Sequence, residues 1–256
     1  MIYSGLTSNT FRQLSPEAVI ELAAECSLHG IEWAGDVHVQ PGDTARGREV
    51  SQRTRQAGLR VAAYGSYYRC GVTAPDAFTD VLASAQALAA PVIRVWAGDR
   101  GPSEADTAFR EAVQRDLSRI AEASAREGIR IALEYHRNTL TETPEDTVAL
   151  LQAVASPALG TLWQVDPLQD PAKNRKALES ILPWLEHLHV FHRSRQDMRI
   201  CLPLGSGSTE WTPYLQAVAG KGRDTYALLE FVRDNDPEAF REDARDLRGL
   251  LESFTP

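Results

Sequence analysis

Short apolar runs alternate along the chain with longer segments in which apolar residues recur at helical spacing. Eight of these runs are predicted to be strands, near residues 2–7, 31–34, 59–64, 92–96, 129–135, 161–166, 187–191 and 225–232. Amphipathic segments lie between successive runs and after the last one. Because the units alternate and recur roughly every 25 to 40 residues, the pattern predicts a closed (β/α)8 barrel.

The expected helix boundaries carry recognisable start and stop residues. At Gly30, Gly58 and Gly128, a helical segment ends and an apolar strand begins, which is typical of a helix closed by a left-handed residue. Predicted N-caps followed by proline are Ser15, Thr143 and Thr212. Short capped loops are therefore expected between the strands and helices.

The competing α/β architecture is an open, doubly wound sheet. Such sheets commonly carry a GxGxxG turn or a GxxxxGK[ST] loop after a strand, and neither motif follows any strand here. No Pro/Gly/Ser-rich linker divides the chain. We therefore predict an α/β fold in which residues 1–256 form a single (β/α)8 TIM barrel.

Composition excludes several classes of protein. The chain has 256 residues and a net charge of -8, which argues against broad contact with nucleic acid. No segment approaches the roughly 20 apolar residues of a membrane helix, and the start lacks the features of a signal peptide. The three cysteines, Cys26, Cys70 and Cys201, are widely spaced and form no CxxC pair. We expect a cytoplasmic protein with neither a disulfide framework nor a thiolate zinc site.

Four polar residues lie at the ends of the last four predicted strands, where barrel enzymes place their chemistry. They are Glu134, Asp166, His189 and Glu230. Side chains alternate between the two faces of a strand, so Ala132 and Glu134 share one face, and Leu133 lies on the other. The same counting turns the other three polar residues towards the barrel interior. The four side chains are therefore predicted to meet at one rim.

A divalent cation would explain this arrangement. Carboxylates crowded in a barrel repel one another and tend to protonate unless a cation lies among them. Three carboxylates and one imidazole suit Mn²⁺, Mg²⁺ or Co²⁺, with Zn²⁺ a further candidate and copper a poorer one. The plainer interpretation of each carboxylate is solvation at the rim or an ion pair with a lysine or arginine.

The chain resembles the xylose isomerase-like TIM-barrel superfamily, which includes sugar phosphate isomerases and epimerases. The resemblance covers nearly the whole chain and rests on "ALEYH", "QVDPLQ", "HLHVFH", "GSGSTEW" and "LLEFV". It implies one divalent metal, Mn²⁺ first, bound by Glu134, Asp166, His189 and Glu230. The stretch "GIEWAGDVHV" is similar to a second strand of the family and implies that Glu32 and His38 lie near the substrate.

The resemblance also suggests further substrate-binding residues, with some departures. These are His136, Gln169, His192 and Arg195, with Arg193 and Arg199 as rivals of Arg195. Related epimerases usually carry a histidine where this chain has Gln169. An amide hydrogen-bonds a hydroxyl but does not transfer a proton near neutral pH, so the substrate or its orientation should differ. The segment "GSGSTEW" is expected to be a loop and the start of a helix.

For the reaction, the resemblance implies isomerisation or epimerisation of a sugar or polyol, with Glu134 and Glu230 as acid and base. A lyase or dehydratase acting on a keto-sugar or keto-inositol, like inosose dehydratase, would begin with the same proton abstraction. An endonuclease of the endonuclease IV type is a weaker candidate, because that site uses three zinc ions and a larger set of histidine and acidic ligands, whereas this chain has only 6 histidines in total and is acidic. A sugar-binding barrel without activity would have little use for the two glutamates. Homo-oligomerisation is left open, because the sequence does not address it.

Overall fold

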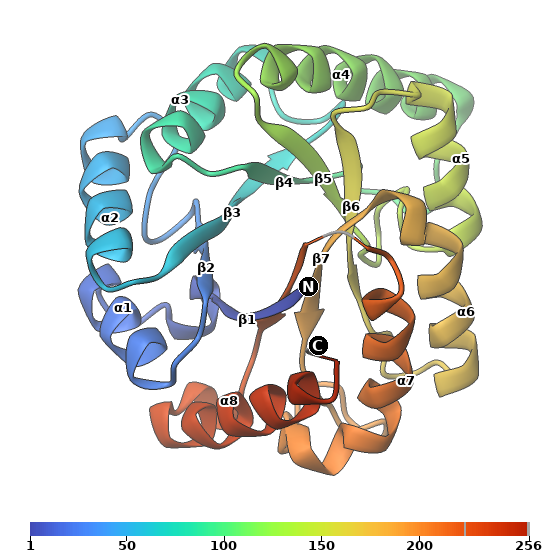
Figure 1. Ribbon diagram of the computed structural model, residues 1–256. Helices are drawn as coiled ribbons and strands as arrows, with labels where there is room; N and C mark the ends of the chain where they lie inside the picture. Colours follow the sequence, from blue (N-terminus) through green and yellow to red (C-terminus); the bar gives the residue numbers. More distant parts are fainter. Residues whose placement is uncertain (223, 255–256) are drawn as a thin grey trace.

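The computed structural model describes residues 1–222 and 224–254, and it confirms the predicted closed barrel (Figure 1). Eight parallel strands pair in chain order, and the last pairs with the first. The strands are β1 Ile2–Thr7, β2 Gly30–Ala34, β3 Arg60–Arg69, β4 Val92–Trp96, β5 Arg130–Glu134, β6 Leu159–Gln164, β7 Leu185–Val190 and β8 Thr225–Leu229. Each lies within a few residues of its predicted run.

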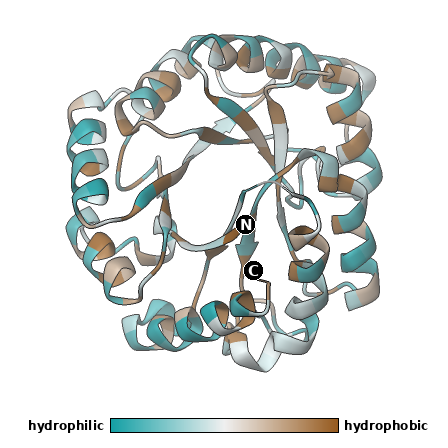
Figure 2. Ribbon diagram, viewed as in Figure 1, coloured by the Kyte–Doolittle hydropathy of each residue, from teal (hydrophilic) through white to brown (hydrophobic). Residues whose placement is uncertain are grey.

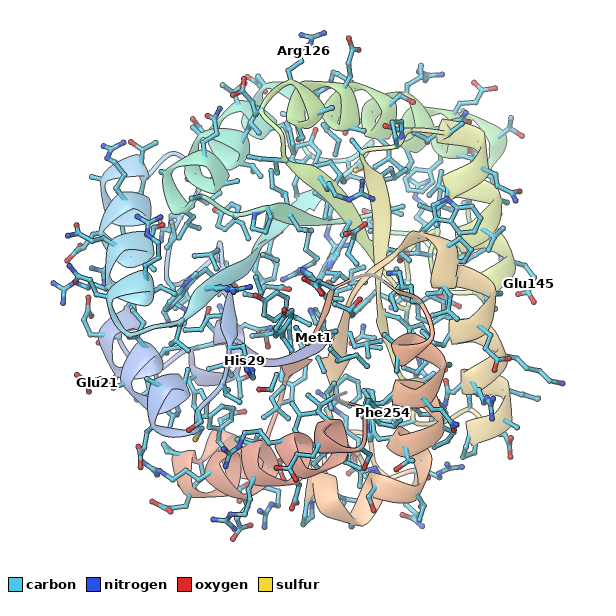
Figure 3. The ribbon with its side chains drawn as sticks, viewed as in Figure 1. Met1, Glu21, His29, Arg126, Glu145 and Phe254 are labelled. Atoms are coloured by element: carbon cyan, nitrogen blue, oxygen red, sulfur yellow. The ribbon has the colours of Figure 1, made fainter. Side chains whose placement is uncertain are left out.

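Helices follow the strands and form a ring around the barrel (Figure 1). They are α1 Pro16–Glu25, α2 Thr44–Gln56, α3 Phe78–Leu88, α4 Thr107–Arg126, α5 Pro144–Val154, α6 Pro171–Ile181, α7 Ser208–Ala219 and α8 Pro237–Glu252. Charged side chains such as Glu21, Arg126 and Glu145 project outward from this ring (Figure 3). Among the described residues, no helix has the length and apolarity required to cross a membrane.

The core has two layers, and their composition follows the alternation of side chains along the strands. Ala63, Val92, Ala132 and Leu162 form a small buried cluster in the barrel interior. The larger apolar cluster contains Ile131, Leu133 and Trp163 together with the inner faces of the helices. Figure 2 shows hydrophobic segments along the strands and mixed hydropathy along the helices. Burial of this second layer holds the helical ring against the barrel.

Most predicted helix boundaries are confirmed. Ser15 and Thr143 accept backbone hydrogen bonds as N-caps of α1 and α5. Gly58 and Gly128 have φ values of 78° and 70°, which is the left-handed region that glycine adopts without strain. Each therefore closes a helix just before a strand, as predicted.

Two boundary predictions were wrong. The left-handed residue after α1 is Ser27, with φ of 55°, whereas Gly30 is the first residue of β2. A Cβ at Gly30 would lie 2.7 Å from the ring of Tyr226, so this glycine serves close packing. Thr212 is not an N-cap, because α7 begins at Ser208 and contains Pro213. Thr212 Oγ1 instead donates to the Ser208 carbonyl oxygen at 2.8 Å.

The barrel closes where β1 meets β8. Five residue pairs from Ile2↔Thr225 to Leu6↔Leu229 set the parallel register of this seam. Just beyond it, Asn9 Nδ2 donates to Glu230 Oε1 at 3.0 Å, so residues 221 positions apart meet at the carboxyl end of the barrel. Pairing of β1 with β8 thus places Asn9 next to Glu230, which is one of the predicted site residues.

Candidate active site

Three of the four predicted metal ligands lie together inside the carboxyl end of the barrel. Glu134 is the last residue of β5, His189 is on β7, and Glu230 directly follows β8. All three side chains are buried, and His189 is 1% exposed. His189 Nδ1 lies 3.4 Å from Glu230 Oε2 and 3.9 Å from Glu134 Oε1. The predicted inward orientation of these side chains is therefore what the structure shows.

Each of the two glutamates is anchored through one oxygen and presents the other to His189. Glu134 Oε2 accepts hydrogen bonds from Arg94 Nη1 at 2.8 Å and from the indole nitrogen of Trp96. Glu230 Oε1 accepts from Asn9, whereas its Oε2 is buried without a hydrogen-bond partner. Two carboxylate oxygens and one imidazole nitrogen consequently face a common point.

Glu32, on β2, orients His189 from the opposite side. Its Oε2 lies 3.1 Å from His189 Nε2, and its Oε1 accepts from Arg94 Nε at 3.3 Å. A histidine that donates from Nε2 to a carboxylate has Nδ1 available as a metal ligand. The position of Glu32 thus favours the tautomer that metal binding requires.

The buried charges strongly influence one another. Burial favours the neutral form of Glu32, but His189 and Arg94 outweigh it and lower the pKa of Glu32 to about 2. Burial lowers the pKa of His189, yet the carboxylates of Glu230 and Glu32 raise it well above its usual range. Protonation of His189 would therefore compete with metal binding at this residue.

The donor set fits a divalent ion. Glu32, Glu134 and Glu230 carry three negative charges and Arg94 one positive charge, which leaves -2 when His189 is neutral. A divalent cation would bring the net charge of this cluster to zero. The unpartnered atoms, His189 Nδ1 and Glu230 Oε2, are both metal donors.

The fourth predicted ligand, Asp166, is oriented differently. It lies two residues beyond β6, and its Oδ1 accepts a hydrogen bond from Arg137 Nη2 at 2.6 Å. Within residues 1–222 and 224–254, no three His, Cys, Asp or Glu side chains already form a complete metal-ligand set. Metal binding by the four residues therefore stays a prediction.

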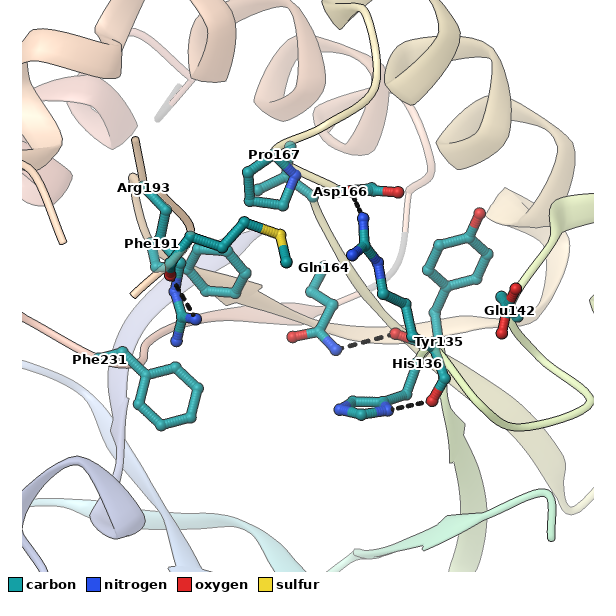
Figure 4. Close-up of a pocket in the computed structure, with 12 residues that line it drawn as sticks. Tyr135, His136, Glu142, Gln164, Asp166, Pro167, Phe191, Arg193 and Phe231 are labelled. Carbon is teal, nitrogen blue, oxygen red and sulfur yellow. Dashed lines mark hydrogen bonds and ion pairs between the residues drawn. The ribbon is translucent and has the colours of Figure 1, made fainter. Parts of the chain in front are cut away.

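A hollow of about 170 Å³ lies above this cluster, and we call it the mouth pocket (Figure 4). Its lining includes Gln164, Asp166, Arg137, Arg193 and Phe231, from the ends of β5 to β8. Gln164 connects the pocket to the buried cluster, because its Nε2 donates to the Tyr135 carbonyl at 2.9 Å and lies 3.4 Å from Glu134 Oε1. The two glutamates do not line the pocket themselves; Gln164 separates it from Glu134, and Phe231, the residue after Glu230, also lines it.

His136 is the predicted substrate-binding residue that the structure places most clearly in the mouth pocket. Its ring stacks on Trp96 with centroids 5.0 Å apart, and its Nδ1 donates to the Arg137 carbonyl at 2.6 Å. The remaining nitrogen, Nε2, is the atom that could contact a substrate. Substrate binding by His136 remains a prediction.

Gln169 and His38 lie outside the mouth pocket. Gln169 is exposed and lines a neighbouring groove between α5 and α6, which shares Tyr135 and Glu142 with the mouth pocket. His38 is buried, with Nδ1 at 2.9 Å from Ser8 Oγ and Nε2 at 3.2 Å from the Leu14 carbonyl oxygen. Because both of its ring nitrogens have partners, the contacts indicate a structural role for His38.

Of the arginines after β7, the structure places Arg193 in the mouth pocket and the other two outside it. Arg195 pairs with Glu210 at 2.9 Å, and Arg199 is 90% exposed and pairs with Asp197. His192 lines a small cavity beside Arg195 and Glu210, and burial lowers the pKa of His192. Arg193 is therefore better placed than Arg195 to contact a substrate.

Arg94 is the main site residue that the sequence pattern did not single out. The signal was an arginine in the middle of the apolar strand "VIRVW", on the same face as Val92 and Trp96. Alternation places this residue inside the barrel, where an arginine requires carboxylate partners. Glu32 and Glu134 are those partners.

The fold and this cluster together define an α/β-barrel protein with a buried glutamate–histidine site at the carboxyl end of its strands. The sequence profile of the xylose isomerase-like TIM barrel family matches residues 20–250. The chain belongs to this family.

Individual relatives are more distant. The chain is 25% identical over 179 residues to a 3-dehydroshikimate dehydratase of Bacillus anthracis, a match that spans 60% of this chain and 61% of the relative. The crystal structure of a probable 3-DHS dehydratase from the same organism covers 97% of this chain and 99% of its own, with 20% identity and a TM-score of 0.81. A xylose isomerase-like TIM barrel protein from Mycobacterium smegmatis, solved in complex with magnesium, has a TM-score of 0.77 and 15% identity and covers 99% and 98%.

Metal binding should be visible as stabilisation. We expect Mn²⁺ at about 100 times its dissociation constant to raise the free energy of unfolding by about 2.7 kcal/mol. For a chain of this length, that corresponds to a melting temperature higher by roughly 5 to 11 °C. A thermal melt with and without Mn²⁺ measures the shift. His189→Asn should abolish it, whereas His192→Asn, outside the buried cluster, should retain it; an equal shift in both variants would contradict the predicted ligand set.

Proposed function

We propose that the chain is a divalent-metal-dependent enzyme that removes a proton from a carbon next to a carbonyl group. The observation that carries this proposal is the approach of two buried carboxylate oxygens, Glu134 Oε1 at 3.9 Å and Glu230 Oε2 at 3.4 Å, to His189 Nδ1. Two carboxylates that converge on one point can act as base and acid on the same substrate carbon. When bound, a divalent ion supplies the positive charge that stabilises an enediolate oxygen.

The two glutamates and the residues that hold them would have different roles in this reaction. One glutamate takes the proton from carbon, the electron pair of the broken C–H bond forms the C=C bond of the enediolate, and the π pair of the carbonyl group moves to its oxygen. The other glutamate enters this step protonated, gives its proton to carbon and becomes a carboxylate. Protonation of the same carbon gives an epimer, and protonation of the former carbonyl carbon, with a hydroxyl proton passing between the two oxygens, gives an isomer. Arg94, Trp96 and Asn9 hold the two carboxylates in place through their second oxygens. The substrate class we propose is a polyhydroxylated keto compound, as in the isomerases and epimerases that the chain resembles.

Dehydration is a second candidate outcome, and the relatives support it. The Bacillus anthracis relative and the structure with a TM-score of 0.81 are a 3-dehydroshikimate dehydratase and a probable 3-DHS dehydratase. The reaction would begin with the same proton abstraction. A hydroxyl group on the β carbon would then leave as water, with its C–O bond pair released to that oxygen and a proton supplied by a carboxyl group.

A single mass measurement separates these outcomes. The Mn²⁺-loaded protein is incubated in D₂O with a panel of ketohexoses and, separately, with 3-dehydroshikimate. We expect a non-exchangeable deuteron in the product of an isomerase or epimerase, and loss of one water from the product of a dehydratase. Absence of both deuterium incorporation and water loss across the panel would count against proton abstraction from these compounds.

A further inference from the structure

A second hollow, of about 470 Å³, lies between the segments that follow β7 and β8. Arg193 and Phe231 line both this hollow and the mouth pocket, so the two are neighbours. Arg199 and Arg233 also line the second hollow. Three arginines and one acidic residue, Asp234, thus line a space beside the mouth pocket, although the chain as a whole is acidic.

The three arginines differ in how their charge is balanced. Arg199 pairs with Asp197 at 2.7 Å, and Arg233 pairs with Glu242. Arg193 has no ion pair within residues 1–222 and 224–254; its Nη1 donates to the Met198 carbonyl oxygen at 3.1 Å, and its Nε is buried without a partner. A partly buried cation without a counter-charge is energetically unfavourable. An anion bound next to Arg193 would therefore stabilise this position.

The environment of Arg193 fixes its guanidinium group rather than leaving it mobile. The guanidinium carbon lies 4.5 Å from the ring centre of Phe231 and 5.0 Å from that of Phe191. An antiparallel bridge between Arg193 and Cys201 holds the backbone at this point. These ring contacts and the Met198 hydrogen bond restrict the guanidinium group and leave Nη2, which is neither hydrogen-bonded nor fully buried in the described chain, to donate to a carboxylate or phosphate.

The position in the fold agrees with this chemistry. In (β/α)8 barrels, the loops after strands seven and eight frequently bind anionic groups of substrates. Here Arg193 follows β7, and its ring partner Phe231 follows Glu230 directly. Phe231 has φ of 56°, a left-handed conformation that is uncommon for an aromatic residue. Asp234 also lines the hollow, but no ion pair joins it to Arg193 in the described chain.

We propose that Arg193 binds an anionic group of the substrate, a carboxylate or a phosphate, while the carbonyl end of the substrate faces Glu134 and Glu230. The substrate class is then an acidic keto compound rather than a neutral sugar. This inference rests on the proposed function for the identity of the ligand as substrate. Anion binding by Arg193 can nevertheless be measured without turnover.

Calorimetric titration with sodium phosphate and, separately, with sodium benzoate tests the proposal, and benzyl alcohol serves as the neutral comparison. We expect at least one anion to bind and Arg193→Gln to weaken it roughly 10- to 100-fold, the range for hydrogen bonds to a charged group. Arg193→Lys keeps the charge and should retain part of the phosphate affinity. Arg195→Gln, two residues away and paired with Glu210, should bind like the unmodified protein.

The two anions distinguish the source of the charge. Preference for phosphate indicates a phosphorylated substrate, and preference for benzoate indicates a carboxylic acid. Failure of both anions to bind, or equal affinity in the Arg193→Gln and unmodified proteins, overturns the proposal. Neither of those results bears on proton abstraction, which the D₂O experiment measures independently.

Discussion

Replacing Glu134 or Glu230 by glutamine is expected to lower turnover by about 10²- to 10⁴-fold, the contribution of a positioned general acid or base. The amide has nearly the same shape as the carboxylate, but it does not take up a proton near neutral pH. Both carboxylates face His189 Nδ1, so the two variants should each be impaired. The rate of deuterium incorporation or water loss measures the effect.

Glu179→Gln is a suitable control for these variants. Glu179 lies on α6 and pairs with Arg175 at 2.8 Å on the protein surface. Its replacement removes one surface ion pair, which typically contributes less than about 1 kcal/mol to stability, and should leave turnover unchanged. Circular dichroism would confirm that all three variants fold. Near-native turnover in either Glu134→Gln or Glu230→Gln would exclude the two-carboxylate mechanism.

Arg94→Met should destabilise the ion-free protein by about 3 to 5 kcal/mol, the usual loss when one partner of a buried ion pair is removed. Arg94 is 3% exposed and holds both Glu32 and Glu134. Methionine fills similar space but leaves these carboxylates without their cation. Urea denaturation of the ion-free protein would measure the difference in unfolding free energy.

A matched surface variant and a double variant test whether the loss of stability comes from the buried ion pairs of Arg94. Arg126→Met removes an exposed pair with Glu122 and should change the unfolding free energy by less than about 1 kcal/mol. Adding Glu32→Gln to Arg94→Met removes one of the uncompensated charges and should restore part of the loss. A loss below about 1 kcal/mol for Arg94→Met alone would show that Arg94 does not hold the cluster together.

The barrel could be predicted well from the sequence, since the signals that indicate it are local. Period-two alternation follows from strand geometry, so it places Glu134, His189 and Glu230 correctly inside the barrel. The N-cap at Ser15 depends on a side chain and a backbone group three residues apart. The N-cap predicted at Thr212 is wrong because Trp211, whose indole donates to the Phe191 carbonyl oxygen, packs within a helix that begins earlier.

The parts of the site that depend on contacts between separate loops could not be predicted from one sequence. Asp166 lies beyond the end of β6, where alternation no longer fixes its direction, and Arg137 from the preceding loop pairs with it. In the resemblance to the family, the number of residues after His189 favours Arg195 over Arg193 as the substrate-binding arginine. The bridge between Arg193 and Cys201 sets the actual orientation of this loop, and such a bridge has no signature in the sequence.

The pairing of β1 with β8 affects when the proposed active site forms during folding. Asn9 follows the first strand and Glu230 the last, yet the hydrogen bond between them fixes one of the two carboxylates that we propose as acid and base. Contacts between such distant parts of a chain form slowly, because closing so long a segment costs conformational entropy. A nascent chain released before Thr225 would have an open sheet edge at β1 and an incomplete acid–base pair, so catalytic competence and barrel closure should arise in the same step.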